Sequence, residues 1–264
     1  MCRLFAFSGA PQPLSTWLLD APHSLEKQAY QPREMVSGTV NVDGTGIAWW
    51  PSPDAPAMRY LFDGPPWADP NLRHLTPRLV SGAQLGVVRS ATPGIGHGIG
   101  HVQPFLDESS DTAFAHNGWL GGFRGPLGHA LLGDFDPALL DALPAFNDSA
   151  ALFCAVLQRQ RGGASAVEAL SDTLTNIVQL CERHNESASL NVVLAQADVI
   201  VAARCSLGVR ANSLYTSVRE HGVLIASEAL DDPAQWTAVP EDSVIEMKGA
   251  TMNVSALFPQ SESE

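Results

Sequence analysis

Cys2 is the residue whose place in the sequence is most suggestive of chemistry. If Met1 is removed, Cys2 carries a thiol and a free α-amine on the same residue. In model peptides a cysteine thiol has a pKa of about 8.5 and an α-amine has a pKa of about 7.7–8.0, so the amine can accept the thiol proton near neutral pH. One residue can then be both nucleophile and base. Position alone does not decide this, because Cys2 could equally be an ordinary strand residue.

Two charged residues stand at the ends of predicted elements. Arg89 closes the apolar strand 85–89, where a guanidinium can hold a carboxylate through two parallel hydrogen bonds. Asp148 opens an apolar helical run, and its default role is the helix N-cap. Its carboxylate could instead bind an ammonium group. Each residue alone is also consistent with a purely structural role.

The tripeptide His116-Asn117-Gly118 stands where the predicted strand 112–116 ends. The Asn117 amide and the Gly118 backbone N–H are donors that could face a developing oxyanion. An Asn-Gly pair equally favours a tight turn, and from the sequence alone the turn is the simpler prediction. We expect His116 to be a hydrogen-bonded strand residue rather than the catalytic base.

The remaining histidines and cysteines give little support for a metal or redox site. His97 and His101 are four residues apart, but they lie in a glycine-rich loop where a helix is not expected. The cysteines are widely spaced and form no C-x-x-C pair. Cys154 and Cys181 fall within apolar helical patterns and are predicted to be core residues. We therefore expect no bound metal and no cofactor.

Composition and charge narrow the classes of protein further. A chain of 264 residues with 45% hydrophobic and 16% charged residues suits one large folded domain, or at most two small ones. Fifteen basic residues against 28 acidic ones, a net charge of −13, argue against binding to nucleic acid or to an anionic membrane. No apolar run is long enough to span a bilayer, and the start lacks the apolar stretch of a signal peptide. A cytoplasmic location is the default expectation.

The elements that must position these residues follow from hydrophobic periodicity. Two long helices are predicted, one beginning at Asp148 and one with its apolar face running from Val167 to Cys181. Strands first, helices in the middle and strands last favour a layered α+β fold with antiparallel sheets over a doubly wound parallel sheet. The predicted strands are 3–8, 45–50, 85–89, 112–116, 190–194, 199–203, 214–218, 223–226 and 244–247.

Five short motifs, taken in order, resemble the class II glutamine amidotransferases. Each motif alone is common, but their order and separations are similar to those of the family. The resemblance implies a four-layer αββα sandwich of two antiparallel sheets, the Ntn hydrolase fold, in a single domain over residues 1–258 with a short polar tail over 259–264. The motifs are Met1-Cys2, Asn41-Val42-Asp43-Gly44, Val88-Arg89-Ser90-Ala91-Thr92, His116-Asn117-Gly118 and Asn147-Asp148-Ser149.

The same resemblance implies a reaction and a role for each matching residue. The reaction is hydrolysis of a γ-glutamyl amide bond, with glutamate released and a small γ-glutamyl molecule as the binding partner. Arg89 would bind the glutamyl α-carboxylate and Asp148 the α-ammonium. The implied catalytic residues are Cys2, Asn117 and Gly118, and the implied substrate-binding residues are Arg89, Thr92, His116 and Asp148.

Further segments resemble the γ-glutamyl hercynylcysteine S-oxide hydrolases of ergothioneine biosynthesis, a group within that family. The pattern already extends to the last predicted strands, which leaves no room for a synthase domain and favours a stand-alone hydrolase. The segments are Met1-Cys2-Arg3, Ala21-Pro22-His23-Ser24-Leu25, Gln28-Ala29-Tyr30-Gln31-Pro32-Arg33, Ser90-Ala91-Thr92-Pro93-Gly94, Pro104-Phe105, Leu190-Asn191-Val192-Val193 and Ala226-Ser227-Glu228-Ala229-Leu230-Asp231-Asp232.

Alternatives remain open at this point. The Pro-His-Ser stretch is also similar to the yeast-type glutathione-degrading amidotransferase subunit. A glutaminase subunit or a γ-glutamyl peptidase that works with partner enzymes is therefore a second interpretation, and a non-catalytic binding module of the same fold is a third. The chain also departs from the family where Thr45 follows the Asp-Gly turn in place of an aromatic residue, and in the loop 97–101.

Overall fold

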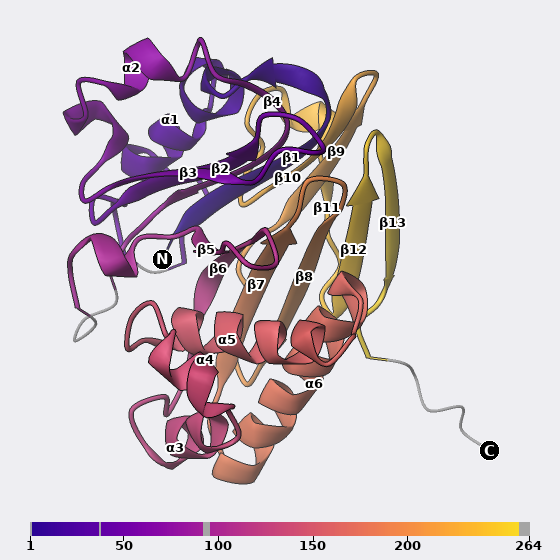
Figure 1. The fold of residues 1–264 in the computed structure, drawn as a ribbon. Coiled ribbons are helices and arrows are strands. Elements are labelled where there is room, and N and C mark those ends of the chain that lie inside the picture. Colours follow the sequence, from indigo (N-terminus) through magenta and orange to yellow (C-terminus); the bar gives the residue numbers. More distant parts are fainter. Residues whose placement is uncertain (1, 37, 92–95, 259–264) are drawn as a thin grey trace.

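The computed structural model describes residues 2–36, 38–91 and 96–258, which form two β-sheets packed face to face between helices (Figure 1). One sheet is built from β1 (Arg3–Pro13), β2 (Thr45–Trp50), β3 (Met58–Phe62), β4 (Val80–Val88), β9 (Tyr215–Arg219), β10 (Gly222–Ala226) and β11 (Thr237–Ala238). The other is built from β5 (Phe105–Asp107), β6 (Thr112–Leu120), β7 (Ala188–Ala195), β8 (Ile200–Leu207), β12 (Ser243–Lys248) and β13 (Thr251–Ala256).

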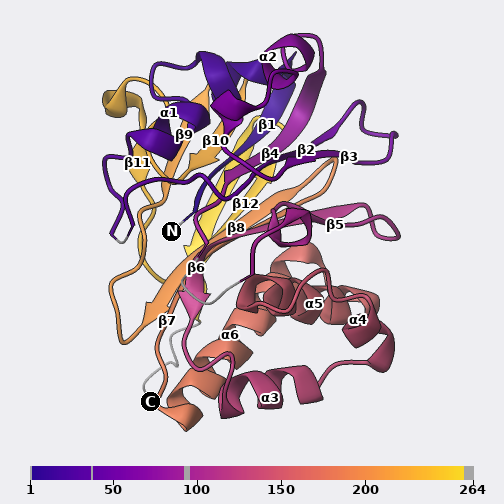
Figure 2. The ribbon, with the colours of Figure 1, turned by 90° about the vertical axis from the view of Figure 1, so that its left-hand side faces the viewer.

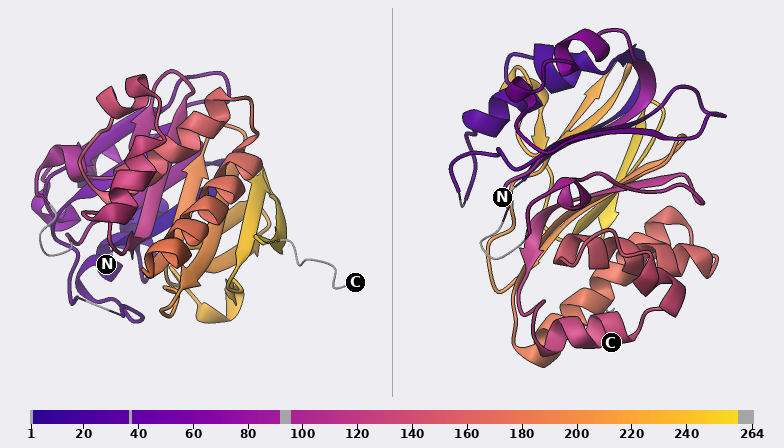
Figure 3. Two further views of the ribbon diagram at one scale, coloured as in Figure 1. Left: turned by 90° about the horizontal axis from the view of Figure 1, so that it is seen from below. Right: turned by 60° about the vertical axis from the view of Figure 1, so that its left-hand side comes forward.

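Helices cover the outer face of each sheet (Figures 2 and 3). The first sheet carries α1 (Leu25–Tyr30), α2 (Leu72–Leu75) and the short turns η1 (Thr16–Asp20) and η2 (Pro66–Ala68). The second carries α3 (Pro126–Gly133), α4 (Pro137–Asp141), α5 (Asp148–Arg161) and α6 (Ala166–His184). Two further turns are η3 (Ile99–His101) and η4 (Pro233–Gln235).

Strand order confirms the predicted fold class. In the described residues the seven-stranded sheet has the order β11-β9-β10-β1-β4-β2-β3, and the six-stranded sheet has the order β13-β12-β8-β7-β6-β5. The neighbouring strands in these parts of the chain run antiparallel. With helices outside both sheets, the molecule is the four-layer αββα sandwich that the sequence predicts. No helix in residues 2–36, 38–91 or 96–258 combines the length and apolarity needed to cross a membrane.

Side-chain alternation along the strands separates the sandwich into layers. Leu4 and Ala6 of β1 point into the core between the sheets, while Phe5 points toward α1. On β6, Ala115 points into the same inter-sheet core, and Phe114 points outward under α5. Residues of β6 with odd numbers therefore face the first sheet, and those with even numbers face the helices.

The helices over the second sheet are held by aromatic packing and by caps. Phe153 of α5 stacks on Phe114 with ring centroids 5.3 Å apart and an interplanar angle of 29°. A capping box at Ser165 and Glu168 starts α6, and Asn185 ends that helix in the left-handed region at φ 53°. This packing fixes the start of α5 against β6.

Two local predictions are wrong. The expected turn at Asn117-Gly118 does not form, because β6 continues to Leu120 and these residues pair with Asn191 and Leu190 of β7. The full partner strand outcompetes the short-range turn preference of Asn-Gly. In addition, the N-cap of α5 is Asn147, whose side chain accepts from the N–H of Ala150. Asp148 is the first residue of the helix.

Candidate active site

A narrow cleft lies where β1 begins, where β4 ends and where α5 starts. Its volume is about 30 Å³. The lining residues are Cys2, Arg89, Ser90, His101, Gln103, His116, Gly118, Asn147, Asp148 and Ser149.

Cys2 reaches this cleft because it directly precedes β1. Arg3 pairs with Val88 in the antiparallel register of β1 and β4, so Cys2 lies beside the Arg89 end of β4. Its side chain is 9% exposed and packs at the margin of the inter-sheet core. The Arg3 guanidinium donates a hydrogen bond of 3.0 Å to the Cys2 carbonyl oxygen, which fixes the backbone at the thiol.

Arg89 is a buried cation with carbonyl partners. It is 4% exposed, and its guanidinium donates to the carbonyl oxygens of Gly96, at 2.9 Å, and Asp43, at 3.3 Å. Among the residues that the structure describes, no carboxylate oxygen comes within 4.0 Å of it. Burying an uncompensated charge costs free energy, so this position favours an anionic ligand.

Asp148 supplies the opposite charge at the start of α5. One carboxylate oxygen accepts from the N–H of Leu120 at 2.9 Å, and the other accepts from the N–H of Ser149 at 2.8 Å. Within the described chain no cationic nitrogen lies within 4.0 Å of it. The cleft therefore holds one cation and one anion that are not paired with each other, which suits a zwitterionic amino acid.

His116 lines the cleft with both ring nitrogens already in hydrogen bonds. Nε2 lies 3.3 Å from the carbonyl oxygen of Ser189, and Nδ1 lies 2.9 Å from Oγ of Ser149. Burial lowers the pKa of His116, and the charge of Asp148 opposes that shift only in part. Because a carbonyl can only accept, the neutral ring carries its proton on Nε2 and accepts from Ser149. This geometry supports the expectation that His116 is not the base.

Asn117 lies on the opposite face of β6, toward the inter-sheet layer. Its side chain is fully buried, is not among the groups that line the cleft, and donates from Nδ2 to Oγ of Ser227 at 3.2 Å. The Asn212 side chain donates to the Asn117 carbonyl oxygen at 3.1 Å. Ala115, two residues earlier on the same face, packs in the same cluster as Cys2, so Asn117 faces the sheet that carries the thiol.

Gly118 has no room for a side chain. A Cβ there would overlap the backbone carbonyl oxygen of Ser189 and lie 2.6 Å from His116 Nε2. We expect Gly118→Ala to destabilise the fold by about 1–3 kcal/mol, because the backbone of β7 must shift. Urea unfolding measures this change.

Gly133 provides the matched control for that substitution. It ends α3, has no positive φ, and a Cβ there would meet nothing within 4 Å. Gly133→Ala is expected to be neutral or stabilising by up to about 1 kcal/mol. Equal unfolding midpoints for the Gly118→Ala variant and the wild type would contradict the packing argument.

A buried ionic network centred on Glu228 adjoins the start of β1, and no role for it is expected from the sequence. The Glu228 carboxylate receives Arg3 Nε at 2.9 Å, His23 Nε2 at 2.8 Å, and the backbone N–H groups of Arg33, at 2.8 Å, and Glu34, at 3.0 Å. Burial acts to raise the pKa of Glu228, but these hydrogen bonds and the charge of Arg3 outweigh it and lower the pKa to about 2. In the sequence, Glu228, Arg3, His23 and Arg33 stood out only as members of segments that carry the family resemblance.

The remaining expectations concern Thr92, His97 and His101. Thr92 lies outside the described residues. His101 Nδ1 lies 3.1 Å from the Asn147 side-chain nitrogen, and His97 lies 3.8 Å from the Asp43 carboxylate. In the part of the chain that the structure describes, no three His, Cys, Asp or Glu side chains gather as metal ligands.

Comparisons with known proteins identify the family of this chain. The family model for class-II glutamine amidotransferases matches residues 1–222. A γ-glutamyl-hercynylcysteine sulfoxide hydrolase of Mycobacterium tuberculosis is 30% identical over 96% of this chain and 96% of its own length. The protein of the same name from Mycolicibacterium smegmatis is 28% identical over 97% of this chain and 100% of its own.

A solved structure extends the comparison to the fold. A glutamine aminotransferase class-II domain protein from Silicibacter pomeroyi superposes with a TM-score of 0.69 at 21% identity, covering 98% of this chain and 100% of that one. At that identity the likeness concerns the fold. The family model, by contrast, includes Cys2, Arg89, the pair Asn117-Gly118 and Asp148 within its matched residues. This chain belongs to the class-II glutamine amidotransferases.

Proposed function

We propose that this protein hydrolyses γ-glutamyl amides, with Cys2 as the nucleophile after removal of Met1. The observation that carries the proposal is the unpaired charge in the cleft. Among the described residues, the Arg89 guanidinium has no carboxylate partner and the Asp148 carboxylate has no cationic partner, and both line the cleft with Cys2. A γ-glutamyl group presents an α-carboxylate for Arg89, an α-ammonium for Asp148 and an electrophilic γ-carbonyl for Cys2.

The proposed reaction has two stages. The α-amine of Cys2 takes the thiol proton, and Sγ attacks the γ-carbonyl carbon to give a tetrahedral oxyanion. That ammonium then donates its proton to the leaving amine as the C–N bond breaks, which leaves a glutamyl thioester. Water attacks the thioester with the amine as base, the C–S bond breaks, and glutamate leaves with the thiol restored.

Asn117 and Gly118 are the proposed donors to the oxyanion. Gly118 lines the cleft, and its backbone N–H is a donor whose position is fixed by strand β6. The Asn117 amide has two protons and donates one to Ser227, so the other remains for an oxygen bound beside Cys2. Loss of one such donor costs about 10²–10³-fold in rate in comparable sites.

The substrate that we propose is γ-glutamyl hercynylcysteine S-oxide, which places the protein in ergothioneine biosynthesis. The support comes from relatives of that printed name that match nearly the whole chain. To test it, purified protein is given the S-oxide, glutathione and glutamine, and glutamate release is followed. A kcat/KM for the S-oxide at least about tenfold above the others supports the proposal. Turnover of glutamine or glutathione with none of the S-oxide would rule out this substrate and favour the glutaminase or peptidase alternatives.

Removal of the Arg89 guanidinium should raise KM more than it lowers kcat, because Arg89 is proposed to bind the substrate rather than to take part in the bond-breaking steps. We expect Arg89→Lys to lower kcat/KM about 10–100-fold, mainly through KM, because lysine cannot form two parallel hydrogen bonds with the α-carboxylate. Steady-state kinetics with a γ-glutamyl amide measures this. Arg78→Lys is the control, since Arg78 is exposed and its side chain donates to the His74 carbonyl oxygen, away from the cleft residues. An unchanged KM in Arg89→Lys would contradict the assigned role.

A further inference from the structure

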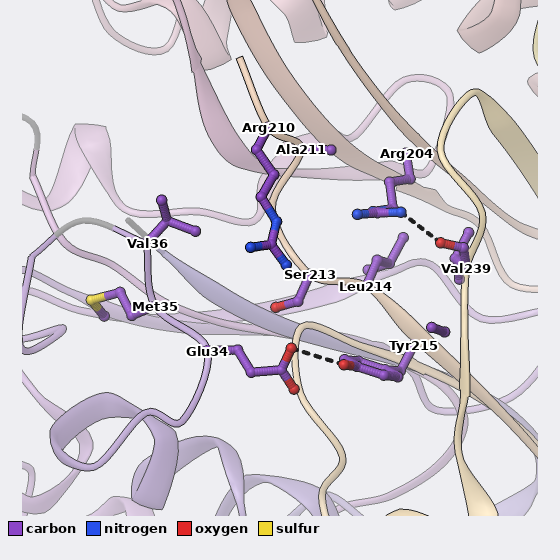
Figure 4. Close-up of a pocket in the computed structure, with 11 residues that line it drawn as sticks. Glu34, Met35, Val36, Arg204, Arg210, Ala211, Ser213, Leu214, Tyr215 and Val239 are labelled. Carbon is purple, nitrogen blue, oxygen red and sulfur yellow. Dashed lines mark hydrogen bonds between the residues drawn. The ribbon is translucent and has the colours of Figure 1, made fainter.

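A second and larger cavity is connected by hydrogen bonds to residues around Cys2. It has a volume of about 530 Å³ and is formed by the chain after α1, by β8 and by the connection from β8 to β9 (Figure 4). Figure 4 shows Arg204 and Arg210 on one side, with Glu34 and Tyr215 opposite them. The lining residues are Glu34, Met35, Val36, Arg204, Arg210, Ala211, Ser213, Leu214, Tyr215, Ala238 and Val239.

Hydrogen bonds join the wall of this cavity to the nucleophile. The backbone N–H of Glu34 donates to the Glu228 carboxylate, which also holds Arg3, the residue after Cys2. Ser213 Oγ donates to the Ser227 carbonyl oxygen at 2.7 Å. The cavity wall is therefore joined, through Glu228, to the residue that follows Cys2.

The same wall reaches the proposed oxyanion donors. Asn212, between the cavity residues Ala211 and Ser213, donates to the Asn117 carbonyl oxygen at 3.1 Å. Gly118, next along β6, lines the cleft instead. No residue among those described lines both recesses. The cleft and the cavity are therefore separate recesses.

The charges of the cavity are not balanced internally. The Arg204 guanidinium donates to the carbonyl oxygens of Asn212, at 2.9 Å, and Val239, at 2.7 Å. Neither Arg204 nor Arg210 has a carboxylate oxygen within 4.0 Å in the described ranges. Glu34 accepts from the Tyr215 hydroxyl at 2.8 Å and is the one carboxylate that lines the cavity among the described residues.

We infer that this cavity binds the leaving half of the substrate, an amine that carries its own carboxylate and a cationic group. The inference rests on the proposed γ-glutamyl hydrolysis. Arg210, whose side chain extends into the cavity, pairs with the carboxylate, and Arg204 adds positive charge behind it. Glu34 and the ring of Tyr215 receive the cation. Hercynylcysteine S-oxide has this chemistry, because its cysteine moiety has a carboxylate next to the released amine and its hercynyl group has a trimethylammonium, whereas the ammonia released from glutamine has neither.

A matched pair of substrates tests the role of Arg210. γ-Glutamylglycine and γ-glutamyl methylamide have the same scissile amide and differ by one carboxylate on the leaving group. We expect the ratio of their kcat/KM values, glycine over methylamide, to fall about 10–100-fold in Arg210→Ala, as for loss of a paired guanidinium. Arg183→Ala, an exposed arginine on α6, should leave the ratio unchanged.

The outcomes separate the inference from the proposed function. If the wild type cleaves both amides and Arg210→Ala leaves their ratio unchanged, the leaving-group site is wrong and the hydrolase proposal stands. If the wild type cleaves neither amide nor the S-oxide, both proposals fail.

Glu34→Gln tests the cation site in the same way. We expect it to lower kcat/KM for the S-oxide relative to γ-glutamylglycine about 3–10-fold, as for loss of a partly exposed charge contact. The backbone N–H of Glu34 that bonds Glu228 is retained in this variant. An unchanged relative kcat/KM would overturn the assignment of Glu34.

Discussion

The Cys2→Ala variant is expected to lose γ-glutamyl hydrolysis by about 10⁴–10⁶-fold while it keeps its fold, since removing a covalent nucleophile has effects of this size. The α-amine, Arg89 and Asp148 remain, so substrate still binds but forms no thioester. The substitution removes one sulfur atom at the margin of the core, where the side chain is 9% exposed. Glutamate release and thermal unfolding, measured on the same preparation, separate lost chemistry from lost structure.

Cys181→Ala is the control for this experiment. Burial raises the pKa of the Cys181 thiol to about 11, with a smaller contribution from the charges of Glu186 and Glu182. That thiol is inert at neutral pH, so the variant should retain wild-type kcat. Intact mass of the wild type after brief exposure to substrate should show the glutamyl adduct on Cys2. Wild-type turnover by Cys2→Ala would refute the mechanism.

Glu228→Gln should give the largest loss of stability. The substitution leaves the Arg3 guanidinium buried without its partner, and the two side chains are each only 1% exposed. Breaking a buried ion pair from one side costs about 3–5 kcal/mol. For a chain of this size that corresponds to a fall in Tm of roughly 6–20 °C. Calorimetry measures this directly.

Low pH should remove the stabilisation that the ionised Glu228 carboxylate gives the wild-type protein. The folded pKa of Glu228 is lowered from 4.5 to about 2, so the folded state favours the ionised carboxylate. The stabilisation is therefore fully present above about pH 5 and is lost as the pH falls from about 4.5 toward 2. The difference in stability between wild type and Glu228→Gln should narrow over that range.

Glu220→Gln is the matched control, because the Glu220 side chain is 87% exposed. Its stability should stay within about 0.5 kcal/mol of the wild type. A Glu228→Gln variant as stable as Glu220→Gln would show that the network contributes little.

Most of the strands and the two long helices could be predicted, because the alternation of apolar residues in strands and their helical periodicity in helices follow from which side chains are buried. The nine predicted strands and the two long helices are present in the structure, most of them with longer bounds. Antiparallel pairing of β1 with β4 then places Cys2 beside Arg89, although 87 residues separate them in sequence. The sequence places Cys2 just before one predicted strand and Arg89 at the end of another. When two such strands pair antiparallel, the start of one lies beside the end of the other.

The errors arose where a distant partner overrides a local preference. Asn117-Gly118 is a good turn sequence, but β7 offers a full ladder of hydrogen bonds that keeps β6 extended. Short or exposed elements such as β3 and β13 have weak patterns and were not predicted. Glu228 could not be identified as a buried hub, since a lone glutamate after an apolar strand is usually solvated.

The contact between Arg3 and Glu228 has a consequence for how the protein is made. The two residues are 225 positions apart. On the ribosome, Arg3 emerges first, and its partner emerges only after nearly the whole chain has been synthesised. Until then the first strand lacks both Glu228 and its neighbour β10. The proposed nucleophile is thus anchored among the last events of folding, so an incompletely translated chain carries the Cys2 thiol without the site proposed to direct it.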